Sequence, residues 1–95
     1  MRVYISGAIT GNKNYIAQFL NAEHELKALG FEVVNPTRLN NIMPKSATYE
    51  EYMDMCMDLL RICDNIYMLK GWHKSAGANR EYGYALAKKM IILRE

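Results

Sequence analysis

The apolar residues fall into short continuous runs and longer segments with helical spacing. Short β-branched and aromatic runs predict strands, and apolar positions at i, i+4 and i+7 predict amphipathic helices. The predicted strands are Arg2–Ser6, Phe31–Val34, Asn65–Leu69 and Met90–Arg94. The predicted helices are Asn14–Leu29, Tyr49–Cys63 and Ala78–Lys89. The chain therefore reads as a single domain, residues 1–95, in which strands and helices alternate.

This order predicts an α/β fold. The strands are almost entirely apolar, which is typical of a parallel sheet covered on both faces. Right-handed crossovers turn the order into a doubly wound sheet, whose ligands bind beyond the carboxyl ends of the strands. Three loops are expected to meet at that edge: Gly7–Lys13, Asn35–Thr48 and Lys70–Gly77. We expect the functional site to be built from these loops and the residues beside them.

Composition and charge argue against two classes of partner, nucleic-acid polymers and membranes. The formal net charge is +2, and the basic residues are scattered, with Lys88-Lys89 as the only basic pair. Such a distribution does not indicate a nucleic-acid polymer as partner. No apolar run is long enough to cross a membrane, and the first residues turn polar too early for a signal peptide. We therefore expect no membrane association.

The cysteines and histidines argue against a disulfide and against a metal cofactor. Cys56 and Cys63 lie on one predicted helix, roughly 10 Å apart along its axis, which is too far for a disulfide. Free thiols suit a reducing cytoplasm. The two histidines, His24 and His73, are far apart and in no ligand spacing. We expect neither a metal nor another cofactor.

Several common motifs are absent. The stretch "SGAITGNKN" lacks both the phosphate-loop lysine pattern and the Gly-x-Gly-x-x-Gly of dinucleotide folds, and no Gly-x-Ser-x-Gly elbow is present. What remains is a Ser-Gly turn between a strand and a helix. This turn either forms a generic binding site for an anion or a hydroxyl group, or is simply a tight turn.

Glu81 and Trp72 are the most notable side chains near the third loop. Glu81 is expected about one turn into its helix, where a carboxylate either complements the helix dipole or acts as a reagent. Trp72 either stacks on a ligand ring, caps the core or lines a subunit contact. Asp54 and Asp58 are expected on a solvated helix face, and Asp64 at a turn.

Three stretches together resemble a known family. They are "YISGAIT" at Tyr4–Thr10, "CDNIYML" at Cys63–Leu69 and "SAGANREYGYA" at Ser75–Ala85. The chain resembles the nucleoside 2-deoxyribosyltransferase superfamily, which includes deoxynucleoside 5′-monophosphate N-glycosidases. The nearest likeness is to small bacterial and phage proteins with a Gly-Trp-x-x-Ser-x-Gly-Ala-x-x-Glu signature, matched by "GWHKSAGANRE". The likeness covers nearly the whole chain.

The resemblance implies a fold and a set of site residues. The fold is a flavodoxin-like three-layer sandwich with the strand order 2-1-3-4. Glu81 is the implied nucleophile, and the Tyr4 hydroxyl is implied to orient its carboxylate. The implied or candidate substrate-binding residues are Ser6, Gly7, Ser75, Gly77 and Trp72. The implied reaction is cleavage or transfer of the N-glycosidic bond of a small-molecule nucleoside or nucleotide.

One position departs from this family. The aspartate that contacts the base lies eight residues before the position of Asp64, where this chain has Cys56. A thiol is a poor substitute for a carboxyl proton donor. The alternative function is therefore a non-catalytic domain that binds or sequesters a nucleotide-derived ligand, and a scaffold with a vestigial site is a weaker third reading.

We also expect a homo-oligomer, at least a dimer. The seven tyrosines and seven methionines provide more apolar surface than one small core needs.

Overall fold

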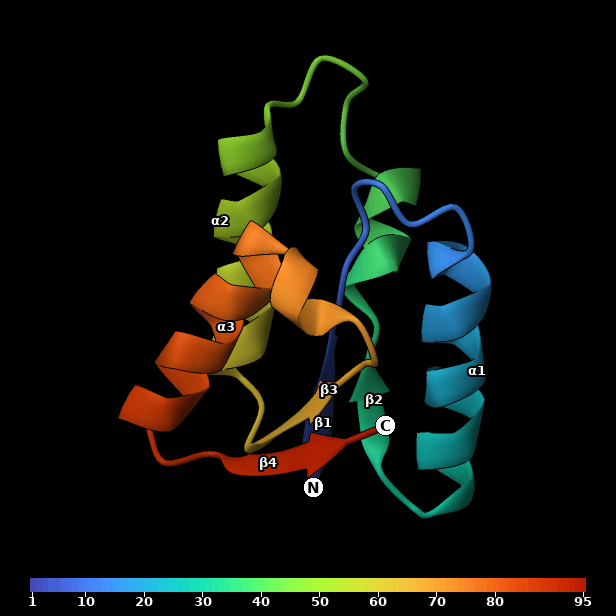
Figure 1. Cartoon of the computed structure of the whole chain (residues 1–95), viewed down its shortest axis with the longest axis vertical. Helices are drawn as coiled ribbons and strands as arrows, with labels where there is room; N and C mark the ends of the chain where they lie inside the picture. Colours follow the sequence, from blue (N-terminus) through green and yellow to red (C-terminus); the bar gives the residue numbers. More distant parts are fainter.

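The computed structural model describes all 95 residues (Figure 1). The strands are β1 (Arg2–Ser6), β2 (Glu32–Val34), β3 (Asn65–Met68) and β4 (Ile91–Arg94). The helices are α1 (Tyr15–Ala28), α2 (Tyr49–Arg61) and α3 (Ala76–Ala87), with short 3-10 helices η1 (Pro36–Asn41) and η2 (Trp72–Lys74). None of the helices is long and apolar enough to cross a lipid bilayer.

The sheet confirms the predicted fold class. All its strand pairs are parallel, and the strands lie in the order β2-β1-β3-β4. In the register of the central strands, Tyr4 pairs with Val34 on one side and with Ile66 on the other. The carboxyl ends of β1 and β3 therefore lie side by side.

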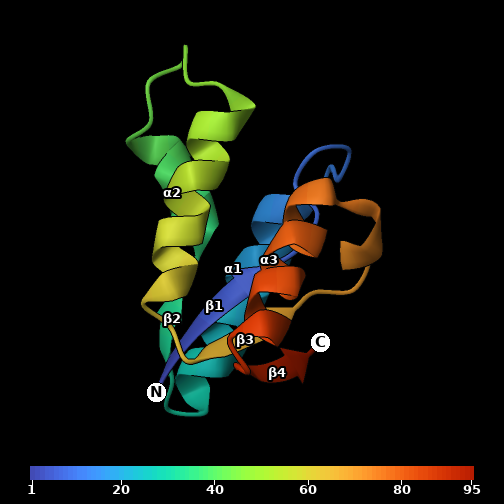
Figure 2. The ribbon, with the colours of Figure 1, turned by 90° about the vertical axis from the view of Figure 1, so that its left-hand side faces the viewer.

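The helices form a layer on each face of the sheet. Val3 and Ile5 of β1 belong to a core cluster with Phe19 of α1. Tyr4 belongs to the opposite cluster, together with Leu60 of α2 and residues of α3. Figure 2 views the molecule from the side of α2 and α3, with α1 behind the sheet. The alternation of side chains along β1 thus sends Tyr4 and Ser6 toward α2 and α3.

Two local differences from the sequence prediction affect the site. Helix α3 begins at Ala76 and not at Ala78, because the Ser75 hydroxyl accepts a hydrogen bond from the Ala78 N–H at 3.1 Å and caps the helix earlier. The predicted loop Asn35–Thr48 contains η1, whose first turn is capped by the Asn35 side chain. Beyond η1 the chain projects past the rest of the molecule before entering α2 (Figures 1 and 2).

Candidate functional site

A cavity of about 370 Å³ opens at the carboxyl edge of the sheet. Gly7 lines it from the loop after β1, Met43 from the segment between β2 and α2, and Gly77 from the start of α3. All three loops expected at this edge therefore contribute to one cavity. Its volume lies within the range of roughly 300–1,000 Å³ that is usual for small-molecule sites.

Glu81 contributes a buried carboxylate to this cavity. Its side chain comes from α3, and the residue is only 4% exposed. The Tyr4 hydroxyl donates a hydrogen bond to Oε2, and the Ser6 hydroxyl donates one to Oε1 at 2.7 Å. Both donors come from the same face of β1. The carboxylate is therefore held in one orientation by the central strand of the sheet.

The position of Glu81 along α3 argues against a role as a dipole-complementing charge. Because α3 starts at Ala76, Glu81 lies in the second turn. The macrodipole acts mainly on charges in the first turn of a helix. The Ser75 side chain already accepts from the N-terminal N–H of Ala78. Glu81 is thus buried away from the helix end, where an ionised carboxylate is costly without a purpose.

The surroundings of Glu81 set its protonation near neutral pH. Burial raises the pKa of Glu81 to about 7, while the hydrogen bonds from Tyr4 and Ser6 and the charge of Arg80 limit this rise. Burial, together with the negative charge of Glu81, raises the pKa of Tyr4 well above its usual value. Tyr4 is therefore a neutral hydroxyl that donates to a carboxylate able to gain or lose its proton under physiological conditions.

Cys56 lies on the α2 side of the cavity. The residue is 2% exposed and lines the cavity together with Tyr52 and Met53. Burial, with a smaller effect from the Glu81 charge, raises the pKa of Cys56 to about 11. The thiol is therefore protonated at neutral pH. Asp54 is exposed and does not line the cavity, as its helical position predicts.

Two glycines allow the backbone to approach its neighbours closely. A Cβ at Gly7 would lie 2.8 Å from a methyl group of Leu69, which is fully buried. A Cβ at Gly77 would lie 2.9 Å from the sulfur of Met53 and 3.1 Å from the Tyr49 hydroxyl. Gly77 therefore lets the first turn of α3 pack against α2 beside the cavity.

The remaining predicted residues are divided between the cavity and other positions. Ser75 and Gly77 line the cavity, as does Gly7. Ser6, expected to bind substrate, is 1% exposed, lies outside the cavity lining and uses its hydroxyl to hold Glu81. The structure therefore brings Ser6 to the site as a support for the carboxylate.

Trp72, proposed as a ring-stacking residue, does not line the cavity. The preceding Gly71 has a left-handed φ of 86°, and η2 follows directly. This turn places the indole in the core cluster beneath α3, with its ring 4.6 Å from that of Tyr82 and 4.0 Å from that of His73. Of the alternatives open for Trp72, this position matches the one in which it caps the core.

A second buried carboxylate, Glu23 of α1, supports the wall of the cavity. It accepts hydrogen bonds from Arg38 at 2.8 and 3.0 Å, from Lys27 at 2.8 Å and from Asn35 at 3.0 Å. Although burial opposes this effect, these hydrogen bonds lower the pKa of Glu23 to about 2. The network fastens η1 and the residue before it to α1. Its sequence signal is that Glu23 occupies an apolar-stripe position, four residues after Phe19.

No three His, Cys, Asp or Glu side chains come together in a group that could bind a metal ion. The chemistry available is that of an oriented carboxylate, a neutral thiol and several hydroxyls around a largely apolar cavity.

Comparison with known proteins places the chain in a family. No curated protein matches it significantly. One family model matches residues 1–94, a range that includes every residue of the cavity. Because this match covers nearly the whole chain, the chain belongs to the DUF4406 family, described as a domain of unknown function.

Proposed function

We propose that the protein cleaves or transfers the N-glycosidic bond of a (deoxy)nucleoside or of its 5′-monophosphate. Glu81 acts as the nucleophile, and Tyr4 holds it in position. The observation that carries the proposal is the buried carboxylate at the cavity, held by hydroxyls from two positions of β1. A buried carboxylate that is held in one orientation beside a cavity is better suited to react with a ligand than to stabilise the fold.

The reaction would proceed in two steps. A Glu81 oxygen attacks C1′ of the sugar as the C1′–N bond breaks, through a transition state with oxocarbenium character. The result is a covalent glycosyl ester and a free base, which leaves with the electron pair of the C1′–N bond. Water or a second nucleobase then attacks C1′ and releases the carboxylate. Each Glu81 oxygen accepts one hydrogen bond from β1, so each keeps a lone pair for the attack.

The shape and lining of the cavity support a ligand of this class. Its volume of about 370 Å³ suits a nucleoside. Met43, Tyr52 and Met53 provide an apolar and aromatic region for the base. Ser75 and the backbone at Gly77, at the start of α3, provide polar groups for the 5′ side of the sugar. The free thiols of Cys56 and Cys63 suit a cytoplasmic location for this enzyme.

Binding without turnover is the second candidate function. The observation in its favour is Cys56, which stands where the resembling enzymes carry a carboxyl group and which remains a neutral thiol. A domain with this cavity and no proton donor for the base would hold a nucleotide-derived ligand and leave it intact.

The test is release of free base from a panel of nucleosides and deoxynucleosides and their 5′-monophosphates, measured by chromatography. We expect release by the wild type and a loss of several orders of magnitude in Glu81→Gln, which keeps the shape of the side chain but loses the nucleophile. Glu25→Gln, at an exposed position of α1, is the matched control and should behave as the wild type. Ligand binding by calorimetry without any base release, in the wild type, would favour the second candidate.

A further inference from the structure

The cavity contains only one carboxyl group. Among all its lining residues, Glu81 is the sole aspartate or glutamate. The two acidic residues nearest to Cys56 along α2, Asp54 and Asp58, are exposed and do not line the cavity. If Glu81 is the nucleophile, no second carboxyl is left to protonate a departing base.

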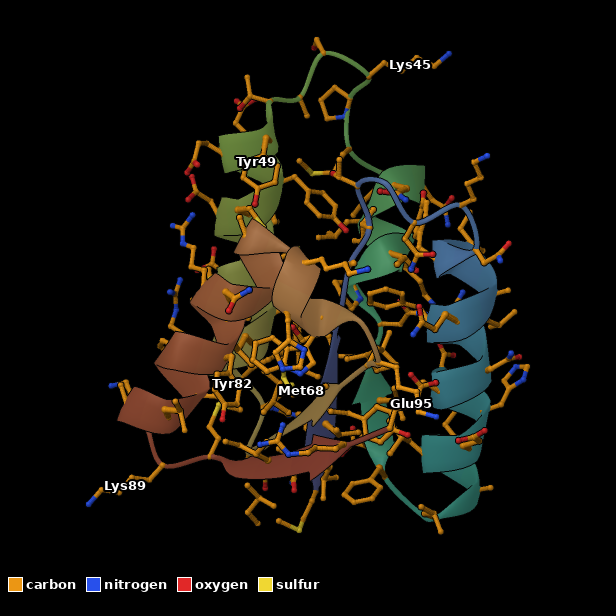
Figure 3. All side chains as sticks on the ribbon, in the orientation of Figure 1. Lys45, Tyr49, Met68, Tyr82, Lys89 and Glu95 are labelled. Atoms are coloured by element: carbon orange, nitrogen blue, oxygen red, sulfur yellow. The ribbon has the colours of Figure 1, made fainter.

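The other ionisable groups at the cavity do not fill this role. The Tyr4 hydroxyl donates its hydrogen bond to Glu81, and the Tyr52 hydroxyl donates to the Pro36 carbonyl at 3.2 Å. Phenols and thiols are in any case much weaker acids than carboxyl groups. Lys45 lies at the tip of the projecting loop, and Figure 3 shows its side chain pointing away from the molecule. The base end of the cavity is therefore without a general acid.

Without a general acid, the cavity can release only a base that does not need to be protonated as it leaves. A neutral purine or pyrimidine departs as an anion unless it is protonated as the bond breaks. A base that already carries a positive charge on its ring system departs as a neutral molecule and needs no proton. On the basis of the proposed function, we propose that the substrates are N-glycosides of cationic bases, such as N7-alkylated purine or pyridinium nucleosides.

The balance of the reaction fits this substrate class. A Glu81 oxygen forms a bond to C1′, the C1′–N bond breaks, and its electron pair neutralises the positive charge of the ring. Water then attacks C1′, the ester bond to Glu81 breaks, and the proton of the water passes to solvent. No oxidant, reductant or additional acid is required.

The lining of the cavity also suits a cation. Tyr49 and Tyr52 bring aromatic rings to it, and Met43 and Met53 bring polarisable sulfur atoms. A positively charged ring is attracted to aromatic faces and to the Glu81 carboxylate. The only cationic side chain that lines the cavity is Lys45, which extends into solvent (Figure 3). A cationic base therefore meets little repulsion on binding.

The test is a matched pair of substrates, guanosine and 7-methylguanosine, together with their 2′-deoxy forms. The two bases have nearly the same shape, but only the methylated one is cationic. We expect kcat/KM of the wild type to be at least about 100-fold higher for the methylated member, since a general acid typically contributes ~10²–10⁴-fold. Kinetic constants for guanosine within about 10-fold of those for 7-methylguanosine would overturn this inference and leave the proposed function standing. Cleavage of neither, with no base released from any substrate of the panel, would overturn both.

A variant provides an independent readout. Cys56→Asp supplies a carboxyl at the base end and should raise guanosine cleavage by about 10-fold or more, without a comparable gain for 7-methylguanosine. Cys56→Asn has nearly the same shape but no acidic proton, and it should not produce the gain. An equal gain in Cys56→Asn would count against the inference. The wild-type comparison of the two substrates stands by itself if Cys56→Asp fails to fold.

Discussion

The hydroxyl of Tyr4 donates a hydrogen bond to the carboxylate of Glu81, across 77 positions of the chain. The contact joins the central strand β1 to the second turn of α3. It holds because Tyr4 is fully buried on the face of the sheet that α3 covers, where its hydroxyl has no access to water. Ser6, two residues later on the same face, supplies the second hydroxyl. One strand therefore determines both the place and the orientation of the carboxylate.

Removing the Tyr4 hydroxyl should impair activity in a way that shows in its pH dependence. The Tyr4 hydrogen bond lowers the pKa of Glu81 and so favours its ionised form. In Tyr4→Phe we expect the rising limb of the pH–rate profile to move to higher pH and the maximal rate to fall about 10- to 100-fold. Ser6→Ala should shift the profile in the same direction. An unshifted profile in both variants would show that these hydroxyls do not control the protonation of Glu81.

The two glycines of α3 offer a matched pair of substitutions. A Cβ at Gly77 would meet Met53 and Tyr49 at the cavity, whereas a Cβ at Gly83 would meet nothing within 4 Å. Alanine in either place gains up to about 1 kcal/mol of helix propensity. We expect Gly83→Ala to raise the melting temperature and leave ligand affinity unchanged. Gly77→Ala should instead displace Met53 and Tyr49 and weaken ligand binding, as measured by calorimetry. Equal affinities in the two variants would contradict this assignment of Gly77.

The fold could be predicted from the sequence because its signals are local and repeated. The short apolar runs and the apolar stripes along the helices determine the order of strands and helices. Because crossover connections between parallel strands are right-handed, this order folds into a parallel doubly wound sheet. The loops at the carboxyl edge follow from the topology alone. The sequence pattern predicts the start of α3 two residues late, because Ser75 can either belong to the preceding loop or cap the helix, and only the Ala78 N–H contact decides between them.

The roles of individual side chains were harder to predict. Trp72 lies in a loop at the carboxyl edge of the sheet, but the left-handed conformation of Gly71 directs the Trp72 side chain into the core. The family resemblance implies that Ser6 binds substrate, and only the packing of α3 on β1 shows that its hydroxyl donates to Glu81. Glu23 could have been found from sequence, since a charge within an apolar helix stripe signals a buried ion pair. Its partners Asn35 and Arg38 could not, because they depend on where η1 packs.

The Glu23 network should stabilise the cavity wall. Glu23→Gln weakens charge-assisted hydrogen bonds to Arg38 and Lys27, so we expect a loss of about 1.5–3 kcal/mol in the free energy of unfolding. Lys27→Met removes only an exposed partner, one helical turn away, and should cost about 0.3–0.5 kcal/mol. Because the pKa of Glu23 is lowered to about 2, its stabilising effect is present above pH ~4.5 and is lost as the pH falls toward 2. Denaturation in urea at pH 7 and at pH 3 measures both effects.

The exposed apolar residues support the expectation of a homo-oligomer. Large apolar side chains are more than half exposed on several elements, including Ile16 on α1 at 61%, Ile42 after η1 at 76% and Leu86 on α3 at 52%. An interface between copies of the chain would be expected to cover some of these residues. We expect light scattering at micromolar concentration to give at least the mass of a dimer, and a monomeric mass would contradict the prediction.

The stability of Glu81→Gln relative to the wild type should depend on pH. A glutamate in the unfolded chain titrates near pH 4.5, whereas burial raises the pKa of Glu81 in the folded protein to about 7. Between these values the folded protein binds more protons than the unfolded chain, so stability is highest below pH ~4.5 and falls as the pH rises through 7. At ~1.4 kcal/mol per pKa unit, the ionised carboxylate destabilises the fold by roughly 3 kcal/mol above pH 7. Glutamine is neutral at every pH and avoids this cost. We therefore expect the variant to gain stability relative to the wild type between pH 5 and pH 8, in urea denaturation, while it loses base release. A variant that is less stable than the wild type at pH 8 would mean that the hydrogen bonds from Tyr4 and Ser6 to the carboxylate stabilise the fold by more than the burial of its charge destabilises it.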